Sequence, residues 1–283
     1  VKIGRMQDAF AYCAELVRKA DRDRFIATLF APAQHRGALH ALYAFNAEVT
    51  RVRDVAHAAL PGEIRLQWWN EVVNGERGDE AGANPVAAAL LSTIERYRLS
   101  SDKLIDLIEA HRFDLYDDPM AGIGDLEAYA SRTSSALFCS AMQILAKTDA
   151  EAICLPAGIA YCITGILRAF PRHAAQRQLY VPGDILERHQ VPLHDLFAGR
   201  PSAGLNAALA ELRDLARSRL RTADGLVTTL PREAIPALLP LALVRRSLDR
   251  LDRSEPFAPA EIPPWRRQWL LWRAAHNPAR LAD

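Results

Sequence analysis

Cysteine is scarce in this sequence, and its placement excludes the usual cysteine-based sites. The chain has four cysteines in 283 residues. No two of them form a C-x-x-C pair, and none stands beside a histidine at the spacing of a zinc site. We therefore expect Cys13, Cys139, Cys154 and Cys162 to be buried free thiols in a reducing compartment.

Net charge is also nearly absent. The 35 lysines and arginines are balanced by 34 aspartates and glutamates, so the formal net charge is +1. A balance this close to zero gives no reason to expect a polyanionic partner. We expect no nucleic-acid partner.

Long apolar runs, signal-peptide cores and glycine-rich phosphate loops are missing as well. No apolar run approaches the roughly 20 residues that a membrane-spanning helix needs. The first eight residues contain no signal-peptide core. The sequence therefore predicts a cytoplasmic chain without a transmembrane segment.

Helical periodicity dominates what is present, and no alternating strand pattern of useful length occurs. Pro61-Gly62 and Pro171 are expected to end helices, Ser101 and Asp125 to cap them, and Pro236 and Pro240 to kink one. The expected helices cover residues 8–20, 22–29, 34–58, 63–74, 85–97, 101–115, 125–146, 150–170, 205–230, 234–252 and 265–275. Since they follow one another without a long linker, we predict an all-α chain with one domain over residues 1–283.

Several motifs follow one another in a recognisable order. The chain reads F-x-x-x-L-x-x-P-x-x-x-R from Phe25 to Arg36, and then ALYAFNAEVTRVRD from Ala41 to Asp54. Later runs are RLQW at residues 65–68, LEAY at 126–129 and GILR at 165–168. In this order the chain resembles the squalene/phytoene synthase family over most of its length. The resemblance implies a helical bundle of the class I isoprenoid synthase type.

The resemblance also implies a chemistry. That family joins two prenyl diphosphates head to head, and magnesium ions neutralise the departing diphosphate. Magnesium prefers oxygen ligands, which the family supplies as carboxylates spaced i, i+4 on one helix face. Acids are therefore expected at positions 50 and 54, and again at positions 169 and 173.

This chain lacks most of those acids. The first motif reads Thr50, Arg51 and Asp54, and the second has Ala169 and His173, while the arginine ahead of the first motif falls at Ala47. A lone carboxylate supplies too few hard ligands for a magnesium cluster. We therefore name no catalytic residue and expect no cofactor and no metal, with Asp54 the one candidate ligand if a metal binds.

The motif positions that match the family can still contact a ligand. We name Tyr43, Asp54 and Arg168 as candidate ligand-binding residues. The apolar helix that contains Ile159 and Leu167 fits the wall of an isoprenoid tunnel and a filled core equally well.

One branch of the family fits better than the rest. The run from Phe25 to Arg36, the core AFNAEV before Asp54, and TSSAL at residues 133–137 resemble mitochondrial complex I assembly factor 6 and its bacterial relatives. This resemblance implies a catalytically degenerate assembly or chaperone factor for respiratory complex I, with complex I subunits or a lipid or prenyl chain as partners. It also implies a location peripheral to the inner membrane, on the matrix side in a mitochondrion.

Two alternatives stay open. The first is an active head-to-head prenyltransferase with an atypical Mg²⁺ site, whose replacement carboxylates would come from Asp54, Asp114 and Glu48. The second is a lipid-binding protein with a deep apolar cavity.

Several charged clusters also have simple structural interpretations. Glu48, Arg51 and Asp54 have the spacing of an i, i+3 network on an exposed helix face. Asp114, Asp117 and Asp118 precede Pro119, which favours a solvated helix end and turn. His173 and the basic stretch 172–177 follow Pro171 and are interpreted as a surface loop, with an anion or lipid headgroup as the alternative.

Tryptophans near the end of the chain share one helix face. Trp265, Trp269 and Trp272 follow i, i+4, i+7 spacing. We expect this face to dock against the core. The interleaved Arg266, Arg267 and Arg273 make a peripheral membrane or partner surface the alternative.

Overall fold

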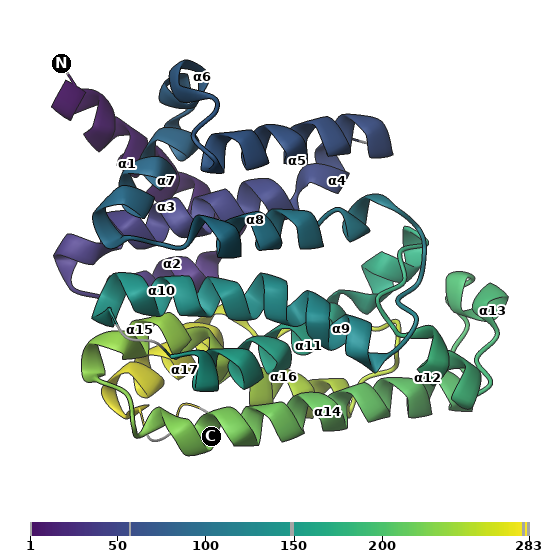
Figure 1. Cartoon of the computed structure of the whole chain (residues 1–283). Coiled ribbons are helices and arrows are strands. Elements are labelled where there is room, and N and C mark those ends of the chain that lie inside the picture. The colour runs from purple at the N-terminus through teal and green to yellow at the C-terminus, as the bar shows by residue number, and fades with distance from the viewer. Residues whose placement is uncertain (1, 57, 148–149, 279–280, 282–283) are drawn as a thin grey trace. The chain divides into compact units, whose positions relative to one another are not determined.

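The computed structural model describes residues 2–56, 58–147, 150–278 and 281. Every regular element in these ranges is helical, and no strand occurs in them (Figure 1). The predicted all-α class is confirmed.

The helices form two compact units, each assembled from separate stretches of the chain. Unit 1 comprises Val1–Leu115, Ala136–Glu151 and Leu230–Pro240, and unit 2 comprises Tyr116–Ser135, Ala152–Thr229 and Leu241–Asp283. The single domain over residues 1–283 stays a prediction.

Unit 1 is built around α3 (Ala33–Thr50), which packs against α1 (Lys2–Ala20), α2 (Arg22–Leu29), α7 (Pro85–Tyr97) and α10 (Ala136–Ala146). The other elements are α4 (Val52–Ala56), α5 (Ala59–Val73), α6 (Gly78–Ala83), α8 (Ser101–Ala110), the 3-10 turns η1 (Phe113–Leu115) and η3 (Arg232–Ala234), and α15 (Ile235–Leu238). Leu39, Leu42 and Phe45 of α3 are fully buried. Each such side chain contributes about 1.5–3 kcal/mol through burial, so packing fixes α3 and the polar residues at its end.

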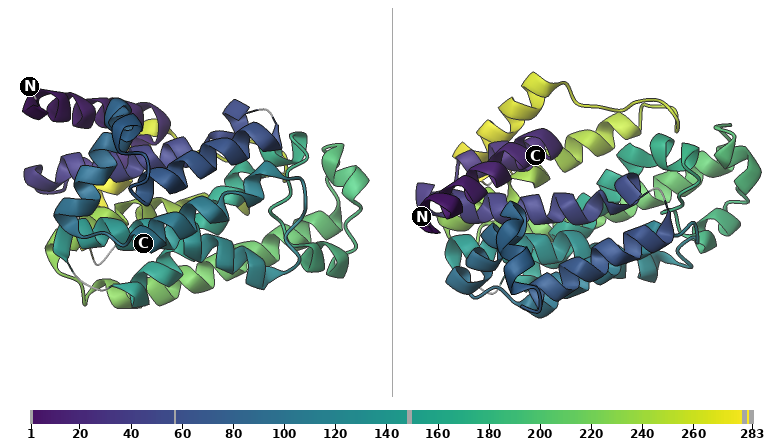
Figure 2. Two further views of the ribbon diagram at one scale, coloured as in Figure 1. Left: turned by 45° about the horizontal axis from the view of Figure 1, so that its top comes forward. Right: turned by 90° about the horizontal axis from the view of Figure 1, so that it is seen from above.

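Unit 2 contains two 25-residue helices, α11 (Glu151–Ala175) and α14 (Ala203–Val227), the first of which begins at the last residue of a unit 1 stretch. The others are α9 (Ile123–Ala130), the π-helical turn η2 (Ser131–Ser135), α12 (Gly183–Arg188), α13 (Leu193–Phe197), α16 (Val244–Leu251) and α17 (Pro264–His276). The 3-10 turn η4 (Leu239–Leu243) begins in the last unit 1 stretch and continues into unit 2. α14 packs against α12 and α16, and Figure 2 gives two further views of these helices.

α11 is longer than the strongly apolar helix expected over residues 150–170, because it runs to Ala175. By length and composition alone it is able to cross a membrane, but 72% of its most apolar window is buried inside the protein. That burial fits a core helix.

Several expected helix boundaries are wrong, and three of these differences lie at prolines or at a polar helix end. The helix expected over residues 34–58 ends at Thr50, and α4 starts after Arg51. Pro61 and Gly62 lie in the first turn of α5, where a proline loses no helical hydrogen bond. Pro171 lies inside α11, which runs on to Ala175.

Other local expectations agree more closely with the structure. Pro236 and Pro240 fall where the chain passes through short 3-10 and α-helical turns before α16, as expected for a kinked start. Asp125 does cap α9, although it accepts hydrogen bonds from the backbone amides of Ala121 and Gly122 from within the first turn. All four cysteines are free thiols; Cys139 is only partly buried, and the other three are buried.

Candidate functional site

The first motif lies at the carboxyl end of α3, where the helix is interrupted. The Thr50 hydroxyl donates to the backbone carbonyl of Asn46 at 2.8 Å, the usual back-bond of a helical threonine. Arg51 leaves the helical conformation, with φ −85° and ψ 1°, and α4 begins after it. Thr50 and Asp54 therefore do not sit on one uninterrupted helix.

Charge at this helix end is satisfied locally. The exposed Arg51 guanidinium donates to the Glu48 carboxylate, so the expected i, i+3 pair forms. Asp54 is exposed on the short helix α4. Glu48 is thus engaged with a cation instead of being available as a metal ligand beside Asp54.

Asp114 is buried, so its expected place in a solvated turn is wrong. Its side chain is 9% exposed and makes a 2.6 Å bond with Nδ1 of His111, which is also buried. Arg53 donates to the Asp114 backbone carbonyl at 2.6 Å and so ties α4 to η1. The reason is packing: η1 folds back under α4 and α5, with Leu115 in direct contact with Gly62.

Tyr43 is buried in the core of unit 1. Its ring is 4% exposed, and the Arg24 guanidinium lies over it at 5.5 Å from the ring centroid. Arg24 is itself buried and donates to Asp21 at 2.6 Å. The candidate ligand residue Tyr43 therefore packs against a neutralised cation from α2.

The second motif lies near the end of α11 in unit 2. Arg168 and Ala169 are partly buried. His173 is buried in the last turn of α11, with its ring 4.7 Å from that of Tyr180. The expected surface loop at His173 is wrong, because α11 continues past Pro171 and carries the histidine into the interior of unit 2.

These residues do not fit a magnesium cluster. Among the candidate motif positions Asp54 brings the one carboxylate, Thr50 brings an uncharged hydroxyl, and Ala169 has no ligand atom in its side chain. His173 brings a nitrogen, which hard magnesium does not favour. No group of three or more histidines, cysteines or acids able to hold a metal occurs in the described ranges.

A cleft of about 400 Å³ opens beside the first motif, within unit 1. It is lined by Tyr12, Glu48, Arg51, Val52, Arg65, Trp68, Trp69, Asn84, Pro85 and Val86. The indole of Trp68 packs edge-on against that of Trp69 and donates to Glu80 at 3.1 Å. Of the two guanidinium groups in this cleft, Arg51 is paired with Glu48, so Arg65 beside the indole rings is the cation that suits an acidic or amphipathic group.

Sequence reasoning missed this cleft although its signal was present. The run RLQW contains Arg65 and Trp68 of the cleft lining, but in the sequence it indicates only the family resemblance. Asn84 was not singled out; it caps α7 by accepting from the amides of Val86 and Ala87 at 2.9 and 3.2 Å. The cleft needs α1, α3, α5 and α7 together, and a linear pattern does not contain that arrangement.

Tyr43, Thr50, Arg51 and Asp54 thus belong to unit 1, whereas Arg168, Ala169 and His173 belong to unit 2. Within unit 1, α3 and α4 bring the first-motif residues to one helix end. Within unit 2, the second-motif residues share the last turns of α11.

Comparison with known proteins places these observations in a family. The model of the family described as squalene/phytoene synthase matches residues 17–273. A human protein named NADH dehydrogenase (ubiquinone) complex I, assembly factor 6 is 30% identical over 86% of this chain and 73% of its own length. A 15-cis-phytoene synthase of Synechococcus elongatus is 24% identical over 94% of this chain and 92% of its own.

A solved structure has the same fold. The crystal structure of a dehydrosqualene synthase in complex with ligand has a TM-score of 0.85 and covers 98% of each chain at 17% identity. The expected class I isoprenoid synthase fold is confirmed by this likeness.

Proposed function

The chain is a member of the squalene/phytoene synthase family, and we propose that within it the chain acts as an assembly factor for respiratory complex I rather than as a prenyl-transferring enzyme. The observation that carries the proposal is its likeness to complex I assembly factor 6, which exceeds its identity to the phytoene synthase.

The motif residues support a role that does not use magnesium. Departure of a diphosphate from an allylic carbon leaves a highly charged group, and cations must neutralise it. Thr50 and Ala169 replace two of the acids that would hold those cations, and His173 replaces a third. A binding or chaperoning role requires no such cluster.

The partners in this proposal are complex I subunits, contacted on the cytoplasmic or matrix face of the inner membrane. A lipid or prenyl chain is a second proposed ligand. Its candidate contact residues stay Tyr43, Asp54 and Arg168, of which Tyr43 is buried under Arg24 and Asp54 is exposed.

The alternative function is head-to-head condensation of two prenyl diphosphates with an atypical magnesium site. Its proposed carboxylates are Asp54, Asp114 and Glu48. Two of them are engaged elsewhere: Asp114 is buried against His111, and Glu48 accepts from Arg51. Only Asp54 supports this alternative without rearrangement.

A deletion strain separates the two functions. Membranes of the strain are examined for assembled complex I on native gels and for NADH oxidation, while lipid extracts are examined for squalene and phytoene. We expect loss of assembled complex I with unchanged isoprenoids, and restoration by the wild-type gene.

Purified protein supplies the converse experiment. It is incubated with Mg²⁺ and farnesyl or geranylgeranyl diphosphate, with an authentic squalene synthase as the positive control. Formation of a C30 or C40 product would overturn the proposal, as would normal complex I in the deletion strain.

A further inference from the structure

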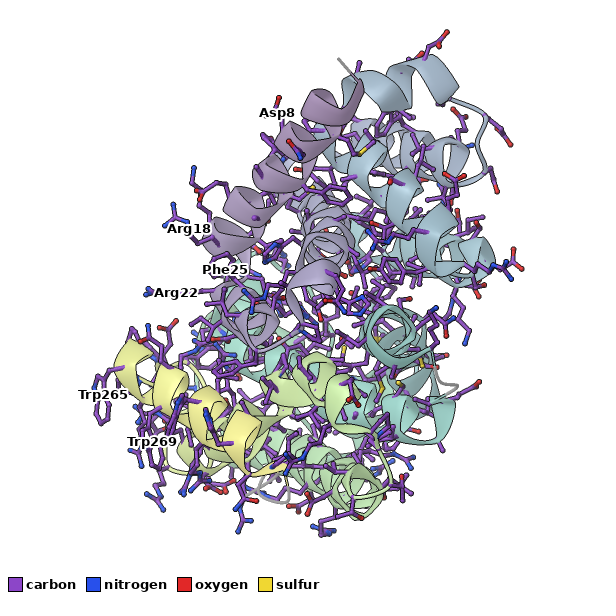
Figure 3. All side chains as sticks on the ribbon, turned by 90° about the vertical axis from the view of Figure 1, so that its left-hand side faces the viewer. Asp8, Arg18, Arg22, Phe25, Trp265 and Trp269 are labelled. Carbon is purple, nitrogen blue, oxygen red and sulfur yellow. The ribbon has the colours of Figure 1, made fainter. Side chains whose placement is uncertain are left out.

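α17 has two apolar faces, and only one of them packs against the protein. Leu270, Leu271 and Ala274 are at most 2% exposed. Trp265, Trp269 and Trp272 are 70%, 48% and 52% exposed, and Figure 3 shows Trp265 and Trp269 projecting outward from the helix. The expectation that this tryptophan face docks against the core is wrong, because the leucine face occupies that place.

The three tryptophans form one continuous stripe. At about 100° per residue, positions 265, 269 and 272 fall within a narrow arc on the side opposite Leu270 and Leu271. Single exposed apolar residues are ordinary, whereas a cluster of large ones marks an interaction surface. An indole has an apolar body and a polar N–H, so it suits a boundary between water and an apolar phase.

Positive charge borders the stripe on one side. α17 carries three arginines and no acid. The Arg273 guanidinium lies 5.1 Å from the ring centroid of Trp269, and Arg266 lies on the same edge of the helix as Arg273. The buried Nε of Arg273 has no hydrogen-bond partner, and guanidinium groups both stack on aromatic rings and bind phosphate.

Arg266 also lines a small pocket with the end of α16. This pocket, of about 90 Å³, is formed by Arg246, Asp249, Arg250, Arg253, Ile262 and Arg266. Arg246 lies 3.8 Å from Asp249, and its buried Nε has no hydrogen-bond partner. Arg250, Arg253 and Arg266 are exposed, so the pocket presents more cationic charge than its one carboxylate neutralises.

The acidic residues near this surface do not neutralise the excess positive charge of the pocket. Asp252 is engaged by Arg213 at 2.8 Å and by Arg217, both on α14. Glu255 and Glu261 are exposed in the segment before α17 and offset part of the positive charge of the arginines. The face therefore combines uncompensated guanidinium groups with exposed indoles.

We propose that the tryptophan stripe of α17 and the adjoining arginine pocket form a docking face for a bilayer that contains anionic phospholipids. Indole rings partition to the headgroup level of a membrane, and a helix with such a face lies in the interface plane. Guanidinium groups pair with lipid phosphates, often through two hydrogen bonds. Charge complementarity selects an anionic bilayer, and the proposal does not depend on the role in complex I assembly.

Vesicle flotation of the full chain tests this proposal. The protein is mixed with vesicles of phosphatidylcholine alone or of phosphatidylcholine with phosphatidylglycerol, and tryptophan emission is recorded in parallel. We expect flotation and a blue-shifted emission with the anionic vesicles only, and both should weaken as salt is raised.

Two matched pairs of variants assign the binding to this face. Trp265→Ser with Trp272→Ser should weaken vesicle binding by roughly tenfold or more, whereas Leu60→Ser with Ile64→Ser, at residues 70% and 63% exposed on α5, should not. Arg250→Gln with Arg253→Gln should weaken binding to anionic vesicles by about fivefold per arginine. The charge-matched control is Arg98→Gln with Arg232→Gln, two exposed arginines of unit 1.

Equal flotation of the wild type with neutral and anionic vesicles would overturn the proposal, as would equal losses in test and control variants. A different outcome would assign the stripe to contact with a second copy of the chain. In that case the wild type is a dimer, and Trp265→Ser with Trp272→Ser makes it a monomer without changing vesicle binding. Circular dichroism shows whether the variant with two tryptophan substitutions is folded. If it is not, the variant with Arg250→Gln and Arg253→Gln still tests the proposal.

Discussion

Gly158 lies where two backbone segments of unit 2 approach each other closely. A Cβ on this residue of α11 would lie 2.2–2.4 Å from Oγ, N and Cα of Ser135. The Ser135 hydroxyl also donates to the Leu155 carbonyl at 3.1 Å, so η2 is held against α11 and has no room to yield. Glycine is required here by contact, since its place inside a helix is otherwise unfavourable.

Replacing this glycine therefore tests the packing directly. We expect Gly158→Ala to lower the free energy of unfolding by about 1–3 kcal/mol or more through overpacking. Gly165→Ala is the control on the same helix: its Cβ meets nothing within 4 Å, and alanine should stabilise by up to about 1 kcal/mol. Urea unfolding measures both, and equal effects would contradict the contact.

His40 is a buried base without a partner for Nε2. It is 8% exposed and stacks on Phe25 at 5.5 Å between ring centroids. Burial, and secondarily the charge of Arg36, lowers its pKa from 6.5 to about 4. The native state therefore holds neutral imidazole down to a pH at which the unfolded chain is already protonated.

Stability should consequently depend on pH through this residue. The folded-state pKa is depressed, so the contribution of His40 is fully present above about pH 6.5 and declines as pH falls toward 4. The loss is on the order of 3 kcal/mol at most. Urea unfolding at several pH values should give a steeper acid loss for the wild type than for His40→Gln. If both proteins lost the same free energy of unfolding as pH falls, the assignment of this loss to His40 would be contradicted. Burial also lowers the pKa of His35, but His35 is present in both proteins and its effect cancels in the comparison.

Single residues were the hardest part of the site to predict from sequence. Their types and spacings were read correctly, but their surroundings depend on chain segments distant in sequence. Asp114 is buried because η1 packs under α4 and α5, and His173 is buried because α11 runs through Pro171. Trp265 is exposed because Leu270 and Leu271 of the same helix occupy the core.

At the scale of elements, the residue that caps α8 is Ser100, one position before the expected cap Ser101. Ser100 has extended backbone, φ −69° and ψ 115°, and its hydroxyl accepts from the Lys103 amide at 3.3 Å. Ser101 is the first residue of the helix itself. Two adjacent serines are equivalent in the sequence pattern, and only the backbone conformation distinguishes them.

These neighbouring serines give a matched pair of substitutions. Ser100→Ala should lower the free energy of unfolding by about 1 kcal/mol, the usual cost of losing a helix cap. Ser101→Ala should change it by less than about 0.5 kcal/mol, as is usual away from such features. Thermal or urea unfolding measures the difference, and a larger loss at Ser101 would return the cap to the position expected from sequence.

The positions of most helices were predictable because apolar periodicity and capping residues act locally. α2 and α7 have the bounds that their patterns predicted. The long helix expected to continue to residue 58 is interrupted at Arg51, whose backbone leaves the helical conformation. Such a break does not change the spacing of apolar residues, so the sequence pattern does not predict it.

At the scale of the whole molecule, the order of motifs was sufficient to predict the fold. RLQW, LEAY and GILR follow the first motif in the order of the family, and the family model matches 17–273. Order along the chain survives where individual side chains diverge, since the fold depends on burial patterns that many residues share. The fold therefore leaves the function open, and the motif substitutions must decide it.

Asp54 gives the sharpest test of that function in the cell. It is the one carboxylate left at the expected motif positions, and it is exposed on α4. Removing its charge should change stability by no more than about 0.5 kcal/mol. If the chain acts without magnesium, a strain carrying Asp54→Asn should assemble complex I to within about twofold of the wild type, because no diphosphate has to be neutralised.

Native gels and NADH oxidation in membranes measure this, with the deletion strain as the zero reference and immunoblots as the check on protein level. A tenfold loss of assembled complex I at normal protein level would mean that this carboxylate still holds a ligand, and the magnesium-dependent alternative would then be preferred.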